Sequence, residues 1–170
     1  MSLPAGYALH VGVPSVSTYL HLRQTAGLSV RTPEQAIAAL QGSWTACYVV
    51  RTDTTTTSTT TSDAPSSSAS TSTAPKPPDP EIVAMGRVLG DGGWYFVVAD
   101  MAVHPHHQRR GLGDVMLKHL LQEIAARAPP QPYVCLSADA AGRRLYTRNG
   151  FVETAPQSVG MVWRPELMLV

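Results

Sequence analysis

The sequence predicts a single α/β domain built on a mixed, mostly antiparallel sheet. The main observation is residues 94–127, where an apolar strand is followed by a basic turn containing two glycines and then by an amphipathic helix. A second strand after that helix is expected to lie parallel to the first, because strand–helix–strand units form right-handed crossovers. A glycine-rich turn at residues 90–93 joins the first strand to its predecessor as an antiparallel hairpin. Helices are therefore expected to flank the sheet.

The composition is that of a soluble globular protein. The chain has 170 residues, 44% of them hydrophobic, which is enough for one domain with a sizeable core. Its formal charge of +1 creates no overall field that would attract nucleic acid or an anionic membrane. Apolar runs stay well below the ~20 residues of a membrane span, and the first residues do not resemble a secretory signal. We therefore expect a cytoplasmic protein with no nucleic-acid or membrane partner.

Four elements are predicted in the first fifty residues: a strand, two helices and a strand, at residues 7–11, 15–26, 32–40 and 44–50. The second helix has the clearest start signal. Thr32 is a suitable N-cap, Pro33 occupies the first helical position, and Gln35 follows three residues after the cap.

Residues 52–80 differ sharply in composition from their surroundings. They are almost entirely Thr, Ser, Pro, Ala and Asp, without Val, Leu, Met or aromatic residues. Such a segment cannot bury enough apolar surface to offset the ~1–2 kcal/mol per residue of backbone entropy that ordering costs. It is therefore interpreted as a disordered insertion, without a function of its own, within a single domain that spans residues 1–170.

The remaining elements alternate between strands and helices. The Trp94 strand consists of aromatic and β-branched residues and is expected to be buried on both faces. The long helix after it carries an apolar stripe and ends before Pro129. Including this strand, the predicted strands are at 82–89, 94–103, 133–137 and 158–163. The predicted helices are the long helix, which ends near Arg127, and a second helix at 142–148.

The turn between the Trp94 strand and the long helix has the features of an anion-binding loop. Glycines at alternate positions, Gly111 and Gly113, allow successive backbone N–H groups to point toward one guest at the helix N-terminus. A diphosphate is the expected guest. A Gly-x-Gly turn without a ligand is the alternative when this pattern is taken alone.

Two motifs in this chain resemble those of the GNAT superfamily of acetyl-CoA-dependent N-acetyltransferases. The first is Ala102-Val103-His104-Pro105 followed by Gln108 to Gly113, which is similar to the cofactor-binding motif of that family. The second, downstream motif consists of Asp139, Gly142, Leu145, Tyr146, Asn149, Gly150 and Phe151. The resemblance implies a GNAT-like mixed, mostly antiparallel sheet, flanked by helices, with one splayed parallel strand pair that receives acetyl-CoA.

The resemblance also implies which residues bind acetyl-CoA. Backbone groups of the central strand would pair with pantetheine, and the N–H groups of residues 109–114 would receive the diphosphate, with one arginine side chain adding contacts. Asp114 departs from the family pattern, and its carboxylate should point away from the phosphates. The expected cofactor-binding residues are Met101, Ala102, Val103, Gln108, Arg109, Arg110, Gly111, Leu112, Gly113, Asp114 and Asp139.

Tyr146 is the expected catalytic residue, because a phenol can protonate the departing CoA thiolate. The alternative is a tyrosine that only packs in the core. The base is not identified: Ala99 and Val97 occupy the strand positions where family members often carry a side-chain base, and Asp100 is expected to be structural. A water chain, or a group from the first two helices, is then left to deprotonate the amine.

No metal site is expected. His104, His106 and His107 are interpreted as solvated side chains, because no supporting cysteine or carboxylate cluster accompanies them. Cys47 and Cys135 lie in apolar strands and are expected to be free thiols that do not act as nucleophiles.

The expected function is transfer of acetyl from acetyl-CoA to a primary amine, with a small-molecule acceptor preferred over a peptide or protein amine. A non-catalytic acyl-CoA sensor is the alternative from another class. Either a monomer or a homodimer is compatible with the sequence.

Overall fold

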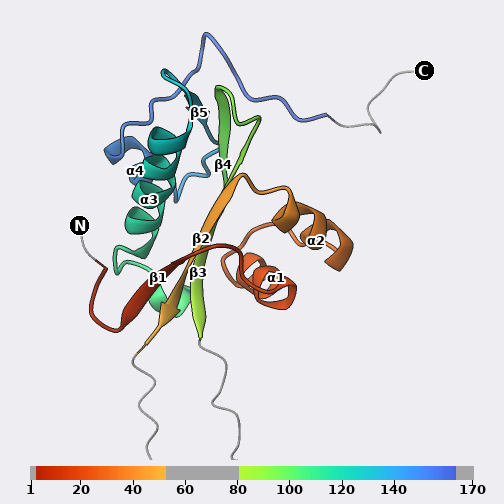
Figure 1. Cartoon of the computed structure of the whole chain (residues 1–170), viewed down its shortest axis with the longest axis vertical. Coiled ribbons are helices and arrows are strands. Elements are labelled where there is room, and N and C mark those ends of the chain that lie inside the picture. Colours follow the sequence, from red (N-terminus) through yellow and green to blue (C-terminus); the bar gives the residue numbers. More distant parts are fainter. Residues whose placement is uncertain (1–2, 53–80, 164–170) are drawn as a thin grey trace, which may run out of the picture.

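The computed structural model describes residues 3–52 and 81–163, which form a mixed five-stranded sheet flanked by helices (Figure 1). The strand order is β1-β2-β3-β4-β5; neighbours from β1 to β4 are antiparallel, and β4 and β5 are parallel. This confirms the predicted fold class. The strands are β1 Tyr7–Val11, β2 Thr45–Arg51, β3 Ile82–Gly90, β4 Tyr95–Val103 and β5 Tyr133–Cys135. The helices are α1 Val16–Thr25, α2 Pro33–Gln41, α3 Leu112–Arg127 and α4 Arg143–Arg148, with a 3-10 turn at Pro105–His107.

The start of each N-terminal helix is fixed by its own sequence. The Ser15 side chain accepts a hydrogen bond from the Thr18 backbone N–H at 3.2 Å at the start of α1. Thr32 and Gln35 form the predicted capping box of α2, in which each side chain accepts from the other residue's backbone N–H. These bonds satisfy donors that the first turn of a helix otherwise leaves unpaired.

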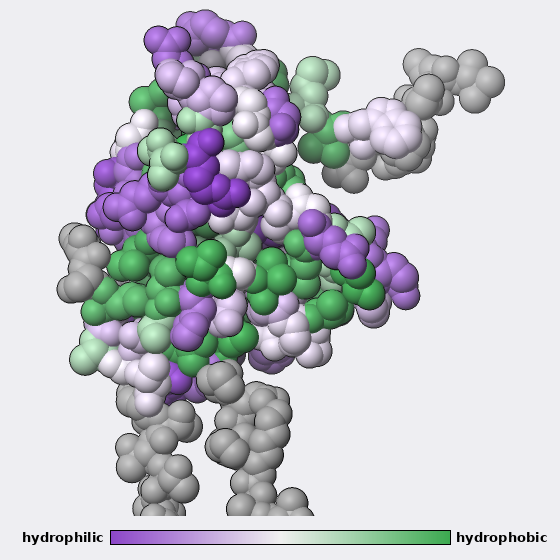
Figure 2. Space-filling model, viewed as in Figure 1, coloured by the Kyte–Doolittle hydropathy of each residue, from purple (hydrophilic) through white to green (hydrophobic). Residues whose placement is uncertain are grey.

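The two faces of the sheet carry separate cores. α1 and α2 cover one face, and α3 crosses the other (Figure 1). In the same view the outer surfaces of α2 and α3 carry many of the hydrophilic residues, as expected for helices whose apolar sides face a sheet (Figure 2). The α3 core includes Val49, Val83, Phe96, Met116, Leu117, Leu120 and Ile124, and the α1–α2 core includes Tyr19, Leu22, Ala36, Leu40, Met85 and Ala102.

The expectation that the Trp94 strand is buried on both faces is wrong at its start. Trp94 and Tyr95 are 59% and 42% exposed, whereas Phe96 is fully buried. The exposed rings pack on each other and on Tyr133 of β5, with centroids 5.4 Å apart for both Trp94–Tyr95 and Tyr95–Tyr133. The first residues of β4 therefore alternate between core and solvent, because only one face is covered there.

The predicted strand at residues 158–163 is also wrong. These residues form no strand, and Met161 and Trp163 are 92% and 75% exposed. β-Branched and aromatic residues favour a strand only where a neighbouring edge supplies hydrogen-bond partners and a surface to pack on. The strand at that end of the sheet, β5, has only three residues, and this segment passes away from it toward the C-terminus (Figure 1).

β4 contains a bulge that the sequence pattern did not reveal. Its pairing with β3 shifts register so that Gly86 opposes both Asp100 and Met101, and Asp100 adopts a positive φ of 53°. Aspartate is among the few residues other than glycine that enter this left-handed region readily. The bulge re-aims the Asp100 side chain toward helix α1, where partners on α1 and β3, described below, hold it.

The predicted insertion lies, from residue 53 to residue 80, outside the described residues. Its two flanks are adjacent, because the Arg51 backbone N–H donates to the Glu81 carbonyl at 2.8 Å. Among the helices of the described ranges, none is long and apolar enough to cross a membrane.

Candidate active site

The parallel strands β4 and β5 separate after a short pairing. Tyr95, Phe96 and Val97 pair with the three residues of β5, whereas Met101 to Val103 continue without a β5 partner. These last residues remain paired with β3 through Met85–Ala102 and Ala84–Val103. Their other backbone edge therefore faces the space beside β4 where the sequence places pantetheine. An amide-rich chain can pair with such an edge as an added strand does.

The turn after β4 has the backbone conformation of an anion-binding loop. Gly111 is the N-cap of α3 with a φ of 84°, and Arg109 also has a positive φ of 61°. The Gln108 amide donates to the Val103 carbonyl at 3.0 Å, which ties the turn to the end of β4. Among the described residues, the N–H groups from Arg109 to Gly113 donate to no protein group. Five successive donors at a helix N-terminus fit a diphosphate.

Gly113 lies where the turn, β4 and α4 meet. A Cβ atom at this position would come within 3.4 Å of the Leu145 side chain and 3.9 Å of the Val103 side chain. A methyl group would therefore be in ordinary van der Waals contact with both side chains, whereas a β-branched residue would crowd the Leu145 side chain.

Both arginines of the turn are exposed. Arg110 donates to the His106 carbonyl at 3.3 Å, which holds its side chain over the loop. Arg109 and Arg110 are thus placed at the start of α3 with charge available to an anion.

Asp114 points away from the turn, toward α4. Its carboxylate is buried and accepts hydrogen bonds from Lys118 at 2.8 Å, Arg148 at 3.0 Å and Asn149 at 2.8 Å. The bonds from Lys118 and Asn149 outweigh the effect of burial and, with Arg148, lower the pKa of Asp114 to about 2. Its backbone N–H donates to the Gly111 carbonyl at 3.1 Å, so this amide belongs to the helix. The residue therefore joins α3 to α4.

Tyr146 lies half-buried on α4, next in sequence to Leu145, whose side chain lies beside Gly113 of the turn. Its ring packs edge-to-face on Phe151, with centroids 6.0 Å apart. Burial, followed by the negative charge of Asp139, raises the pKa of the Tyr146 hydroxyl, which therefore stays protonated at neutral pH. Asp139 itself is exposed, and its carbonyl accepts from the Gly142 and Arg143 N–H groups at the start of α4.

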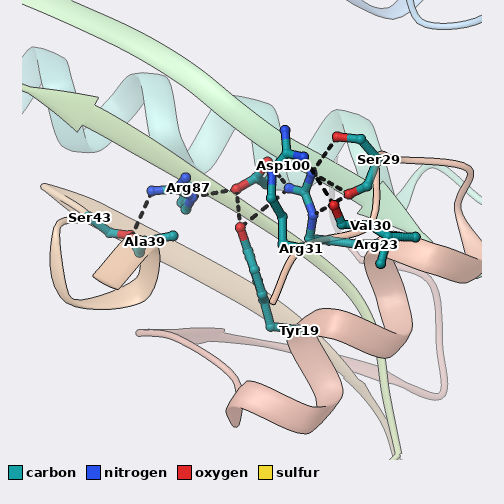
Figure 3. A network of polar contacts seen from close by, with 9 residues as sticks. All are labelled: Tyr19, Arg23, Ser29, Val30, Arg31, Ala39, Ser43, Arg87 and Asp100. Atoms are coloured by element: carbon teal, nitrogen blue, oxygen red, sulfur yellow. Dashed lines mark hydrogen bonds and ion pairs between the residues drawn. The ribbon is translucent and has the colours of Figure 1, made fainter. Parts of the chain in front are cut away.

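A polar pocket of about 250 Å³ opens between α1, α2 and the bulge of β4. At its base the Asp100 carboxylate accepts hydrogen bonds from Tyr19 at 2.6 Å and from two arginines, Arg23 and Arg87 (Figure 3). Burial alone would raise the pKa of Asp100, but the Tyr19 and Arg87 hydrogen bonds and the two guanidinium charges lower it. A carboxylate held in this way is a weak base.

Neither Arg23 nor Arg87 was predicted from the sequence as a site residue. They lie 64 positions apart, on α1 and β3, and only the fold brings both onto Asp100. The available signal was Arg87 in the otherwise apolar sequence of β3, since a charge inside a core requires a partner. The sequence of α1 around Arg23 is mixed and gave no such signal.

The histidines near Pro105 differ in their surroundings, and the prediction that all are solvated is wrong for one of them. His107 is buried, and its Nδ1 shares a 2.8 Å hydrogen bond with the Tyr7 hydroxyl. Burial lowers the pKa of this imidazole. Within residues 3–52 and 81–163, no group of three or more histidine, cysteine or carboxylate side chains could hold a metal. Cys47 is also buried, which raises the pKa of its thiol to about 12.

Comparisons with known proteins agree with this geometry. Residues 79–153, which include β4, the turn and α4, match the acetyltransferase (GNAT) domain family. This part of the chain therefore resembles the GNAT superfamily. An uncharacterized N-acetyltransferase of Pyropia yezoensis is 28% identical over 85 residues, which cover 50% of this chain and 48% of the relative. The chain spans about half the length of the curated relatives it matches.

Solved structures share the fold across nearly the whole chain. A protein of unknown function from methicillin-resistant Staphylococcus aureus, named a probable acetyltransferase, has a TM-score of 0.73 at 26% identity and covers 93% of this chain and 98% of its own. A GNAT family acetyltransferase of Streptococcus pneumoniae has a TM-score of 0.65 at 20% identity, covering 93% and 97%. The latter similarity establishes the fold alone.

Proposed function

We propose that this protein transfers an acetyl group from acetyl-CoA to a primary amine. The observation that carries the proposal is that two features lie close together: free backbone donors from Arg109 to Gly113, and an edge of β4 at Met101 to Val103 that has no β5 partner. The first fits the diphosphate and the second fits the pantetheine amides. Both features lie inside the region that matches the GNAT domain.

The transfer proceeds by direct attack in a ternary complex. The amine nitrogen forms a bond to the thioester carbonyl carbon, the carbon–sulfur bond breaks, and the amine loses a proton to solvent. Tyr146 donates its hydroxyl proton to the departing thiolate, whose conjugate acid has a pKa of ~8–9. The raised pKa of Tyr146 keeps this proton in place before the reaction. Asp100 serves to hold Arg23 and Arg87 and does not act as the base.

The acceptor is a small-molecule amine. The pocket between α1, α2 and β4 has a volume suited to a small metabolite, below the ~300–1,000 Å³ of drug-sized sites. The protein works in the cytoplasm as a single domain, in which residues 52–80 are an insertion without a catalytic role.

The test is a steady-state assay of CoA release with the full-length chain, acetyl-CoA and a panel of primary amines. We expect release that depends on both substrates and saturates with the amine. A parallel calorimetric titration measures acetyl-CoA binding. Tight binding of acetyl-CoA without amine-dependent release of CoA would indicate an acyl-CoA sensor instead of an enzyme. Absence of acetyl-CoA binding would contradict both functions.

A further inference from the structure

We propose that the pocket between α1, α2 and β4 binds an anionic group, so that the acceptor is a small primary amine that also carries a carboxylate or a phosphate. This inference rests on the proposed function and narrows its substrate class. Three of the pocket's lining residues are arginines, Arg23, Arg31 and Arg87, and its one acidic residue is Asp100. The wall therefore keeps a surplus of positive charge after Asp100 is neutralised.

The three arginines have different roles. Arg23 is buried, and its guanidinium donates hydrogen bonds to Asp100, to the Tyr19 hydroxyl and to the carbonyl and hydroxyl of Ser29. All five of its N–H groups are used in this way. It supplies charge and holds the pocket in shape, but it has no donor left for a ligand.

Arg87 retains donors on the pocket side. Its Nε donates to Asp100 and its Nη1 to the Ala39 carbonyl at 2.8 Å, while the second terminal nitrogen has no partner among the described residues (Figure 3). Its side chain is only 12% exposed. A buried guanidinium with unused N–H groups that lines a polar cavity is well suited to bind an oxyanion.

Arg31 stands at the rim of the same pocket. It is exposed, and its one hydrogen bond among the described residues goes to the neighbouring Val30 carbonyl at 3.0 Å. Gln35 lines the rim beside it; its Oε1 accepts from the Thr32 N–H in the capping box, which leaves the amide N–H groups as donors. A ligand here therefore meets mainly donors, which favours an anion over a cation.

The pocket is next to the proposed acetyl group. Asp100 forms part of its base, and Met101, the next residue, is the first backbone position proposed for pantetheine. An acceptor whose anion lies between Arg87 and Arg31 can extend its amine along β4 toward the thioester. This arrangement orients the nucleophile through a charge at its other end.

The test compares amines that differ only in the anion: β-alanine against β-alaninamide for a carboxylate, and phosphoethanolamine against ethanolamine for a phosphate. For each compound, kcat/KM is measured by CoA release, and binding is measured separately by thermal shift without acetyl-CoA. We expect at least one anionic compound to exceed its neutral partner tenfold in kcat/KM and to stabilise the protein. The pair that shows this preference distinguishes carboxylate from phosphate.

Arg31→Gln is the decisive variant, because Arg31 is exposed and outside the buried network. It should reduce kcat/KM for the anionic amine about fivefold or more relative to kcat/KM for its neutral partner, and Arg31→Lys should recover part of the loss. Arg127→Gln, which removes the same charge from the α3 side of the sheet, is the matched control and should change neither.

The outcomes separate this inference from the proposed function. If neutral amines are turned over with kcat/KM equal to or higher than that of the anionic amines, or if Arg31→Gln lowers kcat/KM equally for both partners, the anion site is wrong but the enzymatic function stands. If anionic amines stabilise the protein in a way that requires Arg31 but no CoA is released, the anion site stands and the enzymatic function is wrong. A lack of stabilisation and of preference for both anionic compounds would overturn the anion site whatever the turnover.

Discussion

At the scale of single residues, Tyr146 and Asp114 show how burial with different partners leads to opposite pKa shifts. The Tyr146 hydroxyl is half-buried near the negative Asp139, so its proton is held more tightly. Asp114 is more deeply buried, but the donors of Lys118, Arg148 and Asn149 surround it, so it stays ionised. The first arrangement keeps the phenol protonated at neutral pH, and the second suits a structural anchor.

Replacing Tyr146 tests the proton donor. Tyr146→Phe keeps the ring against Phe151 and removes only the hydroxyl, so stability and acetyl-CoA affinity should change little while kcat falls by ~10²–10⁴-fold. In the parent enzyme the single-turnover rate should decline only above pH 10, because activity that needs the phenol proton is lost as pH rises through the raised pKa. Equal single-turnover rates for both proteins up to pH 10 would make Tyr146 a packing residue.

The anchoring role of Asp114 predicts a specific acid dependence. Its folded-state pKa of about 2 lies below the unfolded value, so its contribution is complete above pH ~4 and is lost as pH falls through about 2. Asp114→Asn should therefore lower the free energy of unfolding by up to about 2 kcal/mol at pH 7. Denaturant titrations of both proteins between pH 2 and pH 7 measure the difference. If it persists unchanged at pH 2, the ionised carboxylate is not what joins α3 to α4.

At the scale of elements, the turn from β4 to α3 depends on one backbone conformation. Gly111 has a φ of 84°, which is costly for a β-branched residue but accessible to asparagine. Gly111→Val should thus weaken acetyl-CoA binding at least tenfold, whereas Gly111→Asn should stay within about threefold of the parent.

Titration calorimetry measures the acetyl-CoA affinity of the variants at both glycine positions. Gly113→Val should also lose at least tenfold, for a different reason: its branched side chain would crowd Leu145 and obstruct the approach of the diphosphate to the turn. Unchanged affinity in both valine variants would place the diphosphate elsewhere. Circular dichroism of each variant separates a local effect from loss of the fold.

At the scale of the whole molecule, the segment between β2 and β3 can be tested by removal. Its flanks are joined by the hydrogen bond from Arg51 to Glu81, so a short hairpin turn could connect β2 to β3 directly. Deleting residues 53–80 should change the free energy of unfolding by no more than ~1–2 kcal/mol, since loop-closure entropy varies only slowly with length. Acetyl-CoA affinity should be kept. A loss of several kcal/mol in denaturant unfolding would show that the segment contributes to the fold.

The local sequence determined most of the secondary structure and the order of its elements. Thr32 and Gln35 placed the start of α2, and the alternate glycines after β4 marked the turn before α3, because capping and backbone conformation are set by neighbouring residues. The sequence also correctly placed Tyr146 in the helix α4 and Asp114 at the start of α3. Their functional roles remain proposals.

Only the tertiary structure decided which distant residues meet. The burial of Arg23 and Arg87 on Asp100 depends on a β-bulge and on helix packing across three elements, which no local pattern encodes. Conversely, the apolar residues at 158–163 look like a strand but find no edge to pair with, because strand formation depends on a partner as well as on propensity. The charge of the pocket, and hence the chemistry of its proposed acceptor, arises from that same long-range packing.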